Sequence, residues 1–485
     1  MRYILTALLL VLATNQVGAD EFTYVDQSGK SVTTSARIIG EGQGFVALER
    51  WDGQIQPVPA GAITERKVTG DPDPAGVTGM QEILTELFGE DKVRFETGSE
   101  SLVALILQGP LDKQGETRGK AFLKKAGAFT KNVDEVFLRF AKQMKFPLRE
   151  LRYPLVLLIF ESDEDFETYT NSVTGGRGLS ATNILGFYSG LTNWLAVRMS
   201  SCDSFEVPLH EAIHQQMYNR VAQRLAPIPK WFDEGIATGF EASGQNINVH
   251  PLQINSRYAR QTQRLTGNVD WRNIVRDDTA FTTDILAGDA YTLAWCLHWM
   301  LVTEQKEGYQ EYVQKLAALP PLGEQQERER VEHFETAFGK SIPELQARFQ
   351  DALQVGIKRQ KVDLRDPKQP GFAEAQQQLG AIQLRAIGTG GLTKADGRLK
   401  NISPLRNMSF YVTFESESGL YTDWILADVR PGQTVPLKEQ LANKRIGGVG
   451  LGSGDRFRIF IRSVAADSPT ATDWKSGMVP GPVGQ

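Results

Sequence analysis

Residues 209–215 read Leu209-His210-Glu211-Ala212-Ile213-His214-Gln215 and contain two of the five histidines of the chain. The two histidines stand four positions apart. On a helix this spacing places both imidazoles on one face, one turn apart, close enough to share a metal ion. We therefore predict a helix here, with a metal site on one of its faces.

A third ligand for such a site is predicted in the next helical segment. A catalytic zinc ion takes three protein ligands and keeps a fourth position open for water. Residues 230–237 read KWFDEGIA, in which Glu234 comes 20 positions after His214. Two histidines at this spacing can also lie on an ordinary helix surface, but the tryptophan before Glu234 and the glycine after it make a coincidence less plausible. Pro227 and Pro229 are predicted to end the first helix and turn the chain back, so that the next segment can present Glu234.

The segments HEAIH (210–214) and WFDEGIA (231–237) resemble those of the gluzincin metallopeptidases, specifically the bacterial peptidase-MA-like proteins. The resemblance covers about residues 95–355 and implies a zincin-like α+β metallopeptidase domain over residues 95–361. It also implies a set of site residues: His210, His214 and Glu234 as ligands of Zn²⁺, and Glu211 as the general base.

The same family carries a helix of pattern Y-x-x-x-x-x-L-x-x-x-L, which Tyr291, Leu297 and Leu301 match within residues 288–302. The resemblance makes Tyr291 a candidate catalytic residue that donates a hydrogen bond to the oxyanion. The alternative is an aromatic side chain packed in the core. His298 lies on the same helical stripe. His250 and His333 are predicted to be solvated.

One departure from better-known gluzincins concerns the residue that orients the first histidine. Some families have an aspartate four positions after the glutamate ligand, and this chain has Thr238 there. The hydrogen-bond partner of the histidines is therefore not identified by the resemblance. Asp233 and Glu241 are the candidates to replace it.

The strand pattern just before the metal helix indicates where a substrate would lie. Residues 185–189 and 194–199 form a predicted hairpin. In gluzincins the last strand before this helix is a sheet edge along which an extended peptide docks, because an edge offers unpaired N–H and C=O groups.

The glycine-rich residues 175–180 lack a following Lys-Ser/Thr pair, so they do not predict a phosphate site.

Residues 1–19 are typical of a secretory signal peptide. A short basic start is followed by the apolar run 4–14, which is too short to span a bilayer, and by Val17-Gly18-Ala19 as a small-residue cleavage site. An uncleaved anchor is the alternative. We expect an exported protein, periplasmic or secreted, with no membrane span after the signal is removed.

The charge balance bears on the partners of the chain, and its cysteine content on a possible disulfide. The chain has 58 acidic and 53 basic side chains and a net charge of −5, which gives no indication of nucleic-acid binding. Cys202 and Cys296 are the only cysteines. An exported chain could pair them, but sequence alone does not decide whether it does.

Short strand patterns flank the central region on both sides. Residues 20–70 predict a small SH3-like β-barrel and residues 376–467 an Ig-like β-sandwich. Residues 71–94 are predicted as a linker and short helix, and residues 468–485 as a disordered tail. The SH3-like resemblance depends on Asp26, Ser28, Gly29, Lys30, Leu48, Asp52, Gly53, Val58 and Pro59. These β domains would either bind a cell-wall or other envelope ligand or act as spacers.

Together these features predict a multidomain α+β protein that works as an exported zinc metallopeptidase, an endopeptidase or aminopeptidase, on peptide or protein substrates. The alternative is a non-catalytic envelope scaffold built on a metallopeptidase-like core. An intact Glu211 argues against the scaffold, since a scaffold has no use for the base.

Overall fold

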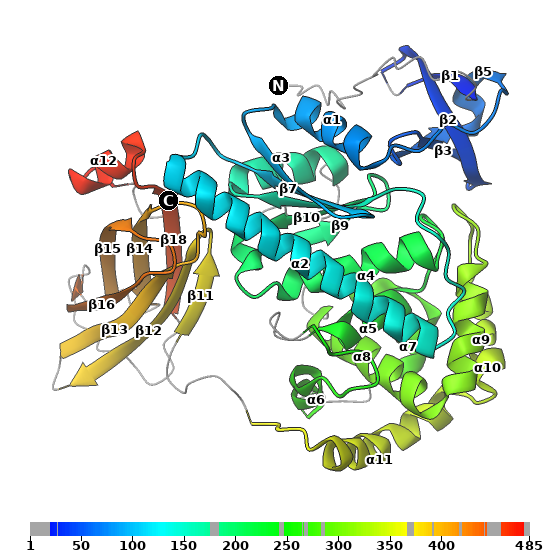
Figure 1. Ribbon diagram of the computed structural model, residues 1–485. Coiled ribbons are helices and arrows are strands. Elements are labelled where there is room, and N and C mark those ends of the chain that lie inside the picture. Colours follow the sequence, from blue (N-terminus) through cyan, green and yellow to red (C-terminus); the bar gives the residue numbers. More distant parts are fainter. Residues whose placement is uncertain are drawn as a thin grey trace.

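The computed structural model shows a mixed α+β architecture with several separate sheets (Figure 1), which confirms the predicted multidomain α+β class at that level. The predicted signal peptide and the glycine-rich residues 175–180 lie outside the described part of the chain. The described residues are 20–26, 28–174, 184–241, 247–263, 265, 270–282, 287–365, 373–389, 392–416, 420–440, 442–443 and 457–479. Within them no helix is both long and apolar enough to cross a membrane.

The central sheet has the strand order β6-β7-β8-β10-β9. Its inner strand β8 (Leu155–Phe160) is parallel to both of its neighbours and is buried at every position, as its unbroken apolar run predicts. The outer strands, β6 and β9, run antiparallel to their neighbours, and each pairs with one strand only among the described residues, so β9 forms one edge of the sheet. The other strands are β6 (Val93–Thr97), β7 (Ser101–Ile106), β9 (Gly186–Tyr188) and β10 (Trp194–Arg198).

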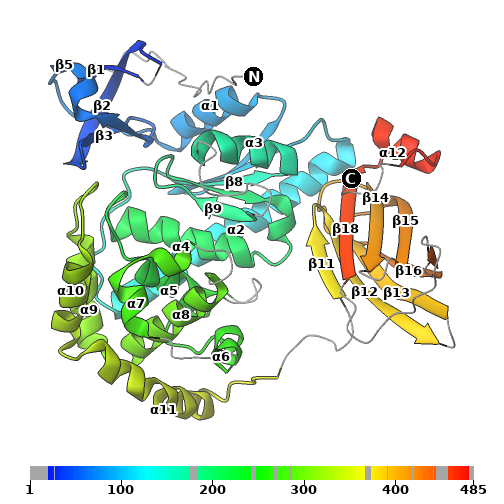
Figure 2. The same ribbon diagram turned by 180° about the vertical axis from the view of Figure 1, so that it is seen from behind.

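Helices cover both faces of this sheet (Figures 1 and 2). On one face, α1 (Val77–Phe88) and α3 (Asp163–Thr174) share a hydrophobic cluster with Val156, Leu158 and Phe160 of β8. On the other face, α2 (Lys113–Gln143) and α4 (Glu206–Arg220) share a second cluster with Leu157 and Ile159. Side chains of one strand alternate between faces, so β8 supports both layers.

A group of helices follows α4 and completes the central region. Gly235 in α5 lies so close to α8 that an added Cβ would be 2.8 Å from the carbonyl oxygen of Ala294. Glycine therefore permits the contact that brings α8 against α5. The helices are α5 (Lys230–Phe240), α6 (Ser256–Thr262), α7 (Trp271–Arg276), α8 (Ala287–Glu304), α9 (Lys306–Ala317), α10 (Glu327–Phe338) and α11 (Ile342–Gln360).

The N-terminal strands form the predicted small β structure, but not a closed barrel. Their order is β4-β3-β2-β1-β5, which leaves β4 and β5 as edges among the described pairs. Four of the five residues of β5 are exposed, so no apolar face drives β5 against β4. The strands are β1 (Glu21–Val25), β2 (Ser31–Gly42), β3 (Phe45–Arg50), β4 (Ile55–Pro59) and β5 (Ile63–Lys67). The SH3-like type stays a prediction.

This N-terminal sheet is joined directly to the central region. The backbone amide of Ile55 donates to the carbonyl of Leu191, in the β9–β10 turn, at 2.7 Å. The hydroxyl of Tyr153 donates to the carbonyl of Arg50 at 3.0 Å. The N-terminal sheet therefore contacts the turn that leads out of edge strand β9.

The C-terminal strands form two antiparallel sheets with a shared core that includes Leu384, Leu399, Phe410 and Val412. This two-sheet arrangement agrees with the predicted sandwich, and its Ig-like type stays a prediction. The strands are β11 (Ala373–Gln377), β12 (Gly380–Thr389), β13 (Leu392–Asn401) and β16 (Thr434–Gln440) in one sheet, and β14 (Met408–Ser416), β15 (Leu420–Val429), β17 (Ala442–Asn443) and β18 (Phe457–Ala465) in the other.

The predicted disordered tail begins instead with a helix, α12 (Pro469–Lys475). The Ser468 side chain caps it by accepting from the amide of Ala471, and Trp474 is buried, with its ring centroid 6.0 Å from that of Tyr411. A cap and one buried aromatic side chain thus hold a segment whose composition alone indicated disorder.

Candidate metal centre

The two histidines of the HEAIH motif lie on α4, as predicted. Leu209, Ile213 and Met217 of the same helix are buried and anchor it in the core. The histidine rings project from a neighbouring face, with centroids 4.8 Å apart and the two Nε2 atoms 3.1 Å apart. Helical spacing alone therefore aims both Nε2 atoms at one region.

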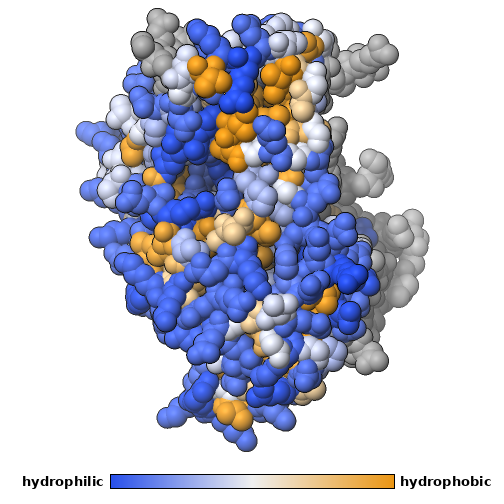
Figure 3. Space-filling model, turned by 90° about the vertical axis from the view of Figure 1, so that its right-hand side faces the viewer, coloured by the Kyte–Doolittle hydropathy of each residue, from blue (hydrophilic) through white to orange (hydrophobic). Residues whose placement is uncertain are grey.

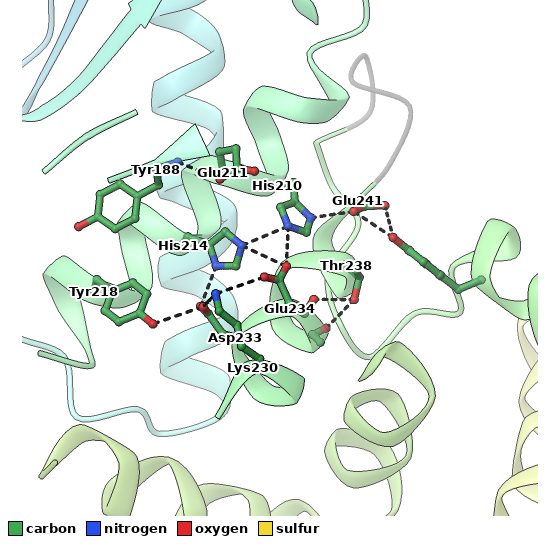
Figure 4. A network of polar contacts seen from close by, with 12 residues as sticks. Tyr188, His210, Glu211, His214, Tyr218, Lys230, Asp233, Glu234, Thr238 and Glu241 are labelled. Atoms are coloured by element: carbon green, nitrogen blue, oxygen red, sulfur yellow. Dashed lines mark hydrogen bonds and ion pairs between the residues drawn. The ribbon is translucent and has the colours of Figure 1, made fainter. Parts of the chain in front are cut away.

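Glu234 reaches this region from α5 (Figure 4). Its Oε2 atom lies 3.1 Å from Nε2 of His210 and 3.5 Å from Nε2 of His214. The possible ligand atoms of the three residues all lie within 4.8 Å of one another. The structure thus brings together the three residues that the sequence analysis predicted as ligands.

Two buried carboxylates hold the far side of the histidine rings. Nδ1 of His210 lies 2.7 Å from Oε1 of Glu241, and Nδ1 of His214 lies 2.7 Å from Oδ1 of Asp233. Asp233 and Glu241, the two candidates from the sequence, are therefore both hydrogen-bond partners: Glu241 of His210, and Asp233 of His214. Thr238, at the position where some families have an aspartate, instead donates to the backbone carbonyl of Glu234 at 2.8 Å.

Tyrosines fix these two carboxylates in turn. The hydroxyl of Tyr258 lies 2.9 Å from Oε2 of Glu241, and the hydroxyl of Tyr218 donates to Oδ2 of Asp233 at 3.3 Å. Lys230 adds a cation, with Nζ 3.1 Å from Oδ2 of Asp233. Tyr218 stands four positions after His214, so helical spacing alone places it on the histidine face of α4, whereas Tyr258 comes from α6 and has no such local signal.

The hydrogen bonds define which histidine atoms are available to bind a metal ion. An imidazole that donates Nδ1–H to a carboxylate is the tautomer whose Nε2 lone pair is free. His210 and His214 therefore present two nitrogen donors beside the Glu234 oxygen. Two such nitrogens 3.1 Å apart need a proton or a cation between them. A set of two imidazoles and one carboxylate fits Zn²⁺ with a fourth position open.

The electrostatics of the site also favour a cation. Burial acts to lower the pKa of His214, but the charges of Asp233 and Glu234 raise it to about 10. Burial acts to raise the pKa of Glu234, but the histidines beside it hold that pKa well below its usual range. The carboxylates therefore keep positive charge in this region.

Glu211 lies beside the three candidate ligands and is held by edge strand β9. Its Oε2 atom accepts a hydrogen bond from the backbone amide of Tyr188 at 2.9 Å (Figure 4). Burial raises the pKa of its carboxyl. The predicted hairpin is present. The last strand before α4, β10, is not the sheet edge that the gluzincin pattern implies, because β10 pairs with β8 as well as with β9. The outer strand of the hairpin, β9, is the one that contacts the predicted base.

Tyr291 of α8 lies next to the site, with its ring centroid 6.3 Å from that of His210. Burial and the charge of Glu234 raise the pKa of its hydroxyl. A cleft of about 480 Å³ opens at this place, and Leu185, His210, Glu211 and Tyr291 are among its lining residues. The site is therefore reachable by a substrate.

The remaining histidines and cysteines lie elsewhere. His298 is buried in the core, where its Nε2 lies 2.8 Å from the Tyr309 hydroxyl and burial lowers its pKa to about 3. His250 was predicted to be solvated, but its ring stacks on Phe140 and it is half-buried. Cys202 and Cys296 are both buried free thiols, so the disulfide left open by the sequence is not formed.

The profile of a family described as Protein of unknown function (DUF1570) matches residues 207–323, a segment that holds His210, His214, Glu234 and Tyr291. No curated protein matches the chain.

Two solved structures were found to be similar over most of the chain. One is the ZmpB metallopeptidase from Clostridium perfringens, at 10% identity and a TM-score of 0.27, over 88% of this chain and 89% of that one. The other is the M60 catalytic domain from Clostridium perfringens ZmpC in complex with the sialyl T antigen, at 11% identity and a TM-score of 0.28, with the same coverage of 88% and 89%. TM-scores this low do not establish a shared fold.

Proposed function

We propose that this protein is a zinc-dependent metallopeptidase, acting as an endopeptidase or aminopeptidase on peptide or protein substrates. The observation that supports this most is the meeting of His210, His214 and Glu234, whose ligand atoms lie within 4.8 Å of one another, beside Glu211 and a sheet edge. Three donors of this kind with an adjacent glutamate are suited to metal-assisted hydrolysis.

His210, His214 and Glu234 would hold the zinc ion. When bound, zinc supplies Lewis acidity that lowers the pKa of a water molecule and polarises the scissile carbonyl. Asp233 and Glu241 would keep both imidazoles in the tautomer that binds metal.

Glu211 would act as the general base. Its Oε2 is held by the Tyr188 amide, whereas its Oε1 has no hydrogen bond to another described residue. That second oxygen is available to take a proton from the attacking water and return it to the leaving amine. Tyr291 would donate its hydroxyl proton in a hydrogen bond to the oxyanion, because it lines the same cleft and its raised pKa keeps it protonated.

Strand β9 would hold the substrate backbone. It is an edge strand, so main-chain hydrogen bonds can form along it with little demand on sequence. We further propose that the protein acts outside the cytoplasm, a proposal that rests on the composition of residues 1–19.

Substitution Glu211→Gln tests the proposal. We expect purified wild-type protein to contain one zinc per chain by elemental analysis and to cleave casein or a peptide library. The Glu211→Gln protein should retain zinc and lose cleavage by a factor of about 10² or more, since a carboxamide cannot accept the proton. Wild-type protein that binds no zinc would refute the metal site. Zinc-loaded protein that cleaves nothing would favour the scaffold alternative.

A further inference from the structure

A second cavity, of about 200 Å³, lies where the N-terminal sheet meets the end of α4. Four arginines line it, and we refer to it as the arginine cavity: Arg37, Arg149, Arg152 and Arg224. Figure 3 shows the side of the molecule that carries this junction, with a hollow bordered by hydrophilic residues below the N-terminal sheet. Nothing in the proposed chemistry uses these side chains.

The buried carboxylate of the arginine cavity, that of Glu49, is already paired. The Glu49 carboxylate binds Arg224 through Oε1 and Arg37 through Oε2, the latter at 2.6 Å from Nε. Arg152 is at the limit of an ion pair with the same carboxylate, at 3.8 Å. One buried glutamate is thus shared by three guanidinium groups. Glu150 is the second acid of the lining, so four arginines face two carboxylates and the cavity keeps an excess of positive charge.

Arg149 and Arg152 retain N–H groups for a further partner. Arg149 donates from Nη2 to the carbonyl of Ala222, and Arg152 donates from Nη2 to the carbonyl of Pro72 at 2.8 Å. No carboxylate in the described part of the chain forms an ion pair with Arg149. Partial burial lowers the pKa of Arg149, as expected for a guanidinium without such a partner.

The arginine cavity adjoins the metal centre through one tyrosine. Tyr218 lines the cavity and also bonds Asp233, the residue that holds His214. Its ring stacks on Tyr188, the last residue of β9, with centroids 5.9 Å apart. A peptide that follows edge strand β9 past Tyr188 therefore runs towards the cavity.

We propose that the arginine cavity is a specificity subsite that receives the side-chain carboxylate of an acidic residue in a peptide held along β9. The proposal rests on the proposed peptidase activity. Guanidinium groups match a carboxylate with paired N–H donors, and Arg149 and Arg152 supply them, whereas Arg37 and Arg224 are occupied by Glu49.

Peptides that differ only in one residue test this subsite. We would use acetylated, amidated peptides in which a single glutamate is moved through successive positions around the scissile bond, each paired with its glutamine counterpart. At one position kcat/KM should be about tenfold higher for glutamate, the effect of roughly one charged hydrogen bond. The double variant Arg149→Gln/Arg152→Gln should abolish this preference through KM, with kcat little changed. A free C-terminus on the glutamine peptide shows whether a terminal carboxylate substitutes for the side chain.

Controls separate the subsite from the catalytic proposal. Arg348→Gln removes an exposed arginine on α11 and should leave the preference intact, and thermal unfolding of each variant reports whether it folds. Fluorescence anisotropy of labelled peptides on zinc-loaded Glu211→Gln protein measures the preference without cleavage, so it can be read even if wild-type protein cleaves nothing. Equal binding of every pair, or a preference that survives the double variant, would overturn the proposal.

Discussion

Replacing Glu241 by glutamine should weaken zinc binding although Glu241 is not itself a ligand. Its Oε1 lies 2.7 Å from Nδ1 of His210, and its side chain is 9% exposed, so water cannot easily take over this hydrogen bond. A buried hydrogen bond to a charged group is worth about 1.5–3 kcal/mol, and loss of a partner behind a histidine ligand costs about 10–100-fold in metal affinity. The two estimates agree, because about 1.4 kcal/mol of binding free energy corresponds to a tenfold change in affinity.

The measurement is zinc affinity by competition with a chelator of known affinity, on apo protein prepared by dialysis. Tyr258→Phe removes the hydroxyl that holds Glu241 and should weaken binding less, by about two- to tenfold. Because both side chains act through His210, the double variant should be little worse than Glu241→Gln alone.

Thr238→Val is the matched control. Thr238 occupies the position where some gluzincins have an aspartate, but its hydroxyl bonds the helix backbone, so zinc affinity should stay within about twofold of wild type. Unchanged affinity in Glu241→Gln, or a large loss in Thr238→Val, would refute the assignment of Glu241 as the residue that positions His210.

Three further predictions concern the core and the cleft. Gly235→Ala should lower the free energy of unfolding by about 1–3 kcal/mol in denaturant titrations, because the new methyl would meet the Ala294 carbonyl at 2.8 Å, and an unchanged midpoint would contradict this close contact. Tyr291→Phe should reduce kcat by about 10–100-fold with KM nearly constant, whereas a purely packed tyrosine would leave kcat unaltered. His298 has a pKa of about 3 in the folded chain, so its contribution to stability is complete above the ordinary value of 6.5. As the pH falls below 6.5, His298 becomes protonated in the unfolded chain, whereas in the folded chain it stays neutral until the pH approaches its lowered pKa of about 3. The stability difference between wild type and His298→Asn should therefore shift by about 1.4 kcal/mol per pH unit, and a pH-independent difference would be the contrary result.

Local patterns in the sequence predicted the parts of the site that depend on helix geometry. The spacing of His210 and His214 was sufficient to predict that both imidazoles share one face, because a helix fixes the direction of its side chains. Glu234 lies on another helix, and it was predicted from the W-x-x-E-G pattern and the resemblance to gluzincins. The apolar run of β8 and the hairpin before α4 were predicted for similar reasons, since burial on both faces and period-two alternation are local signals.

Features that depend on distant contacts could not be read in this way. Glu241 and Asp233 were equal candidates until the structure showed that each holds a different histidine, and Tyr258 reaches Glu241 from a helix 17 positions away. Barrel closure of the N-terminal strands failed for a similar reason, because strand composition does not say which edges meet. Long-range pairing decides such features, and a single sequence carries little of that information.

The hydrogen bond from Tyr188 to Glu211 has a consequence for alignment of a substrate. The Tyr188 amide is the one that faces away from β10, as the neighbouring Ser189 amide donates to Trp194 of that strand. A peptide laid along β9 would find this donor already taken by the carboxylate. The substrate carbonyl opposite it would then have no backbone partner, and it would be the carbonyl nearest to Glu211. The residue assigned as base would thus also select which bond along the peptide is exposed to attack.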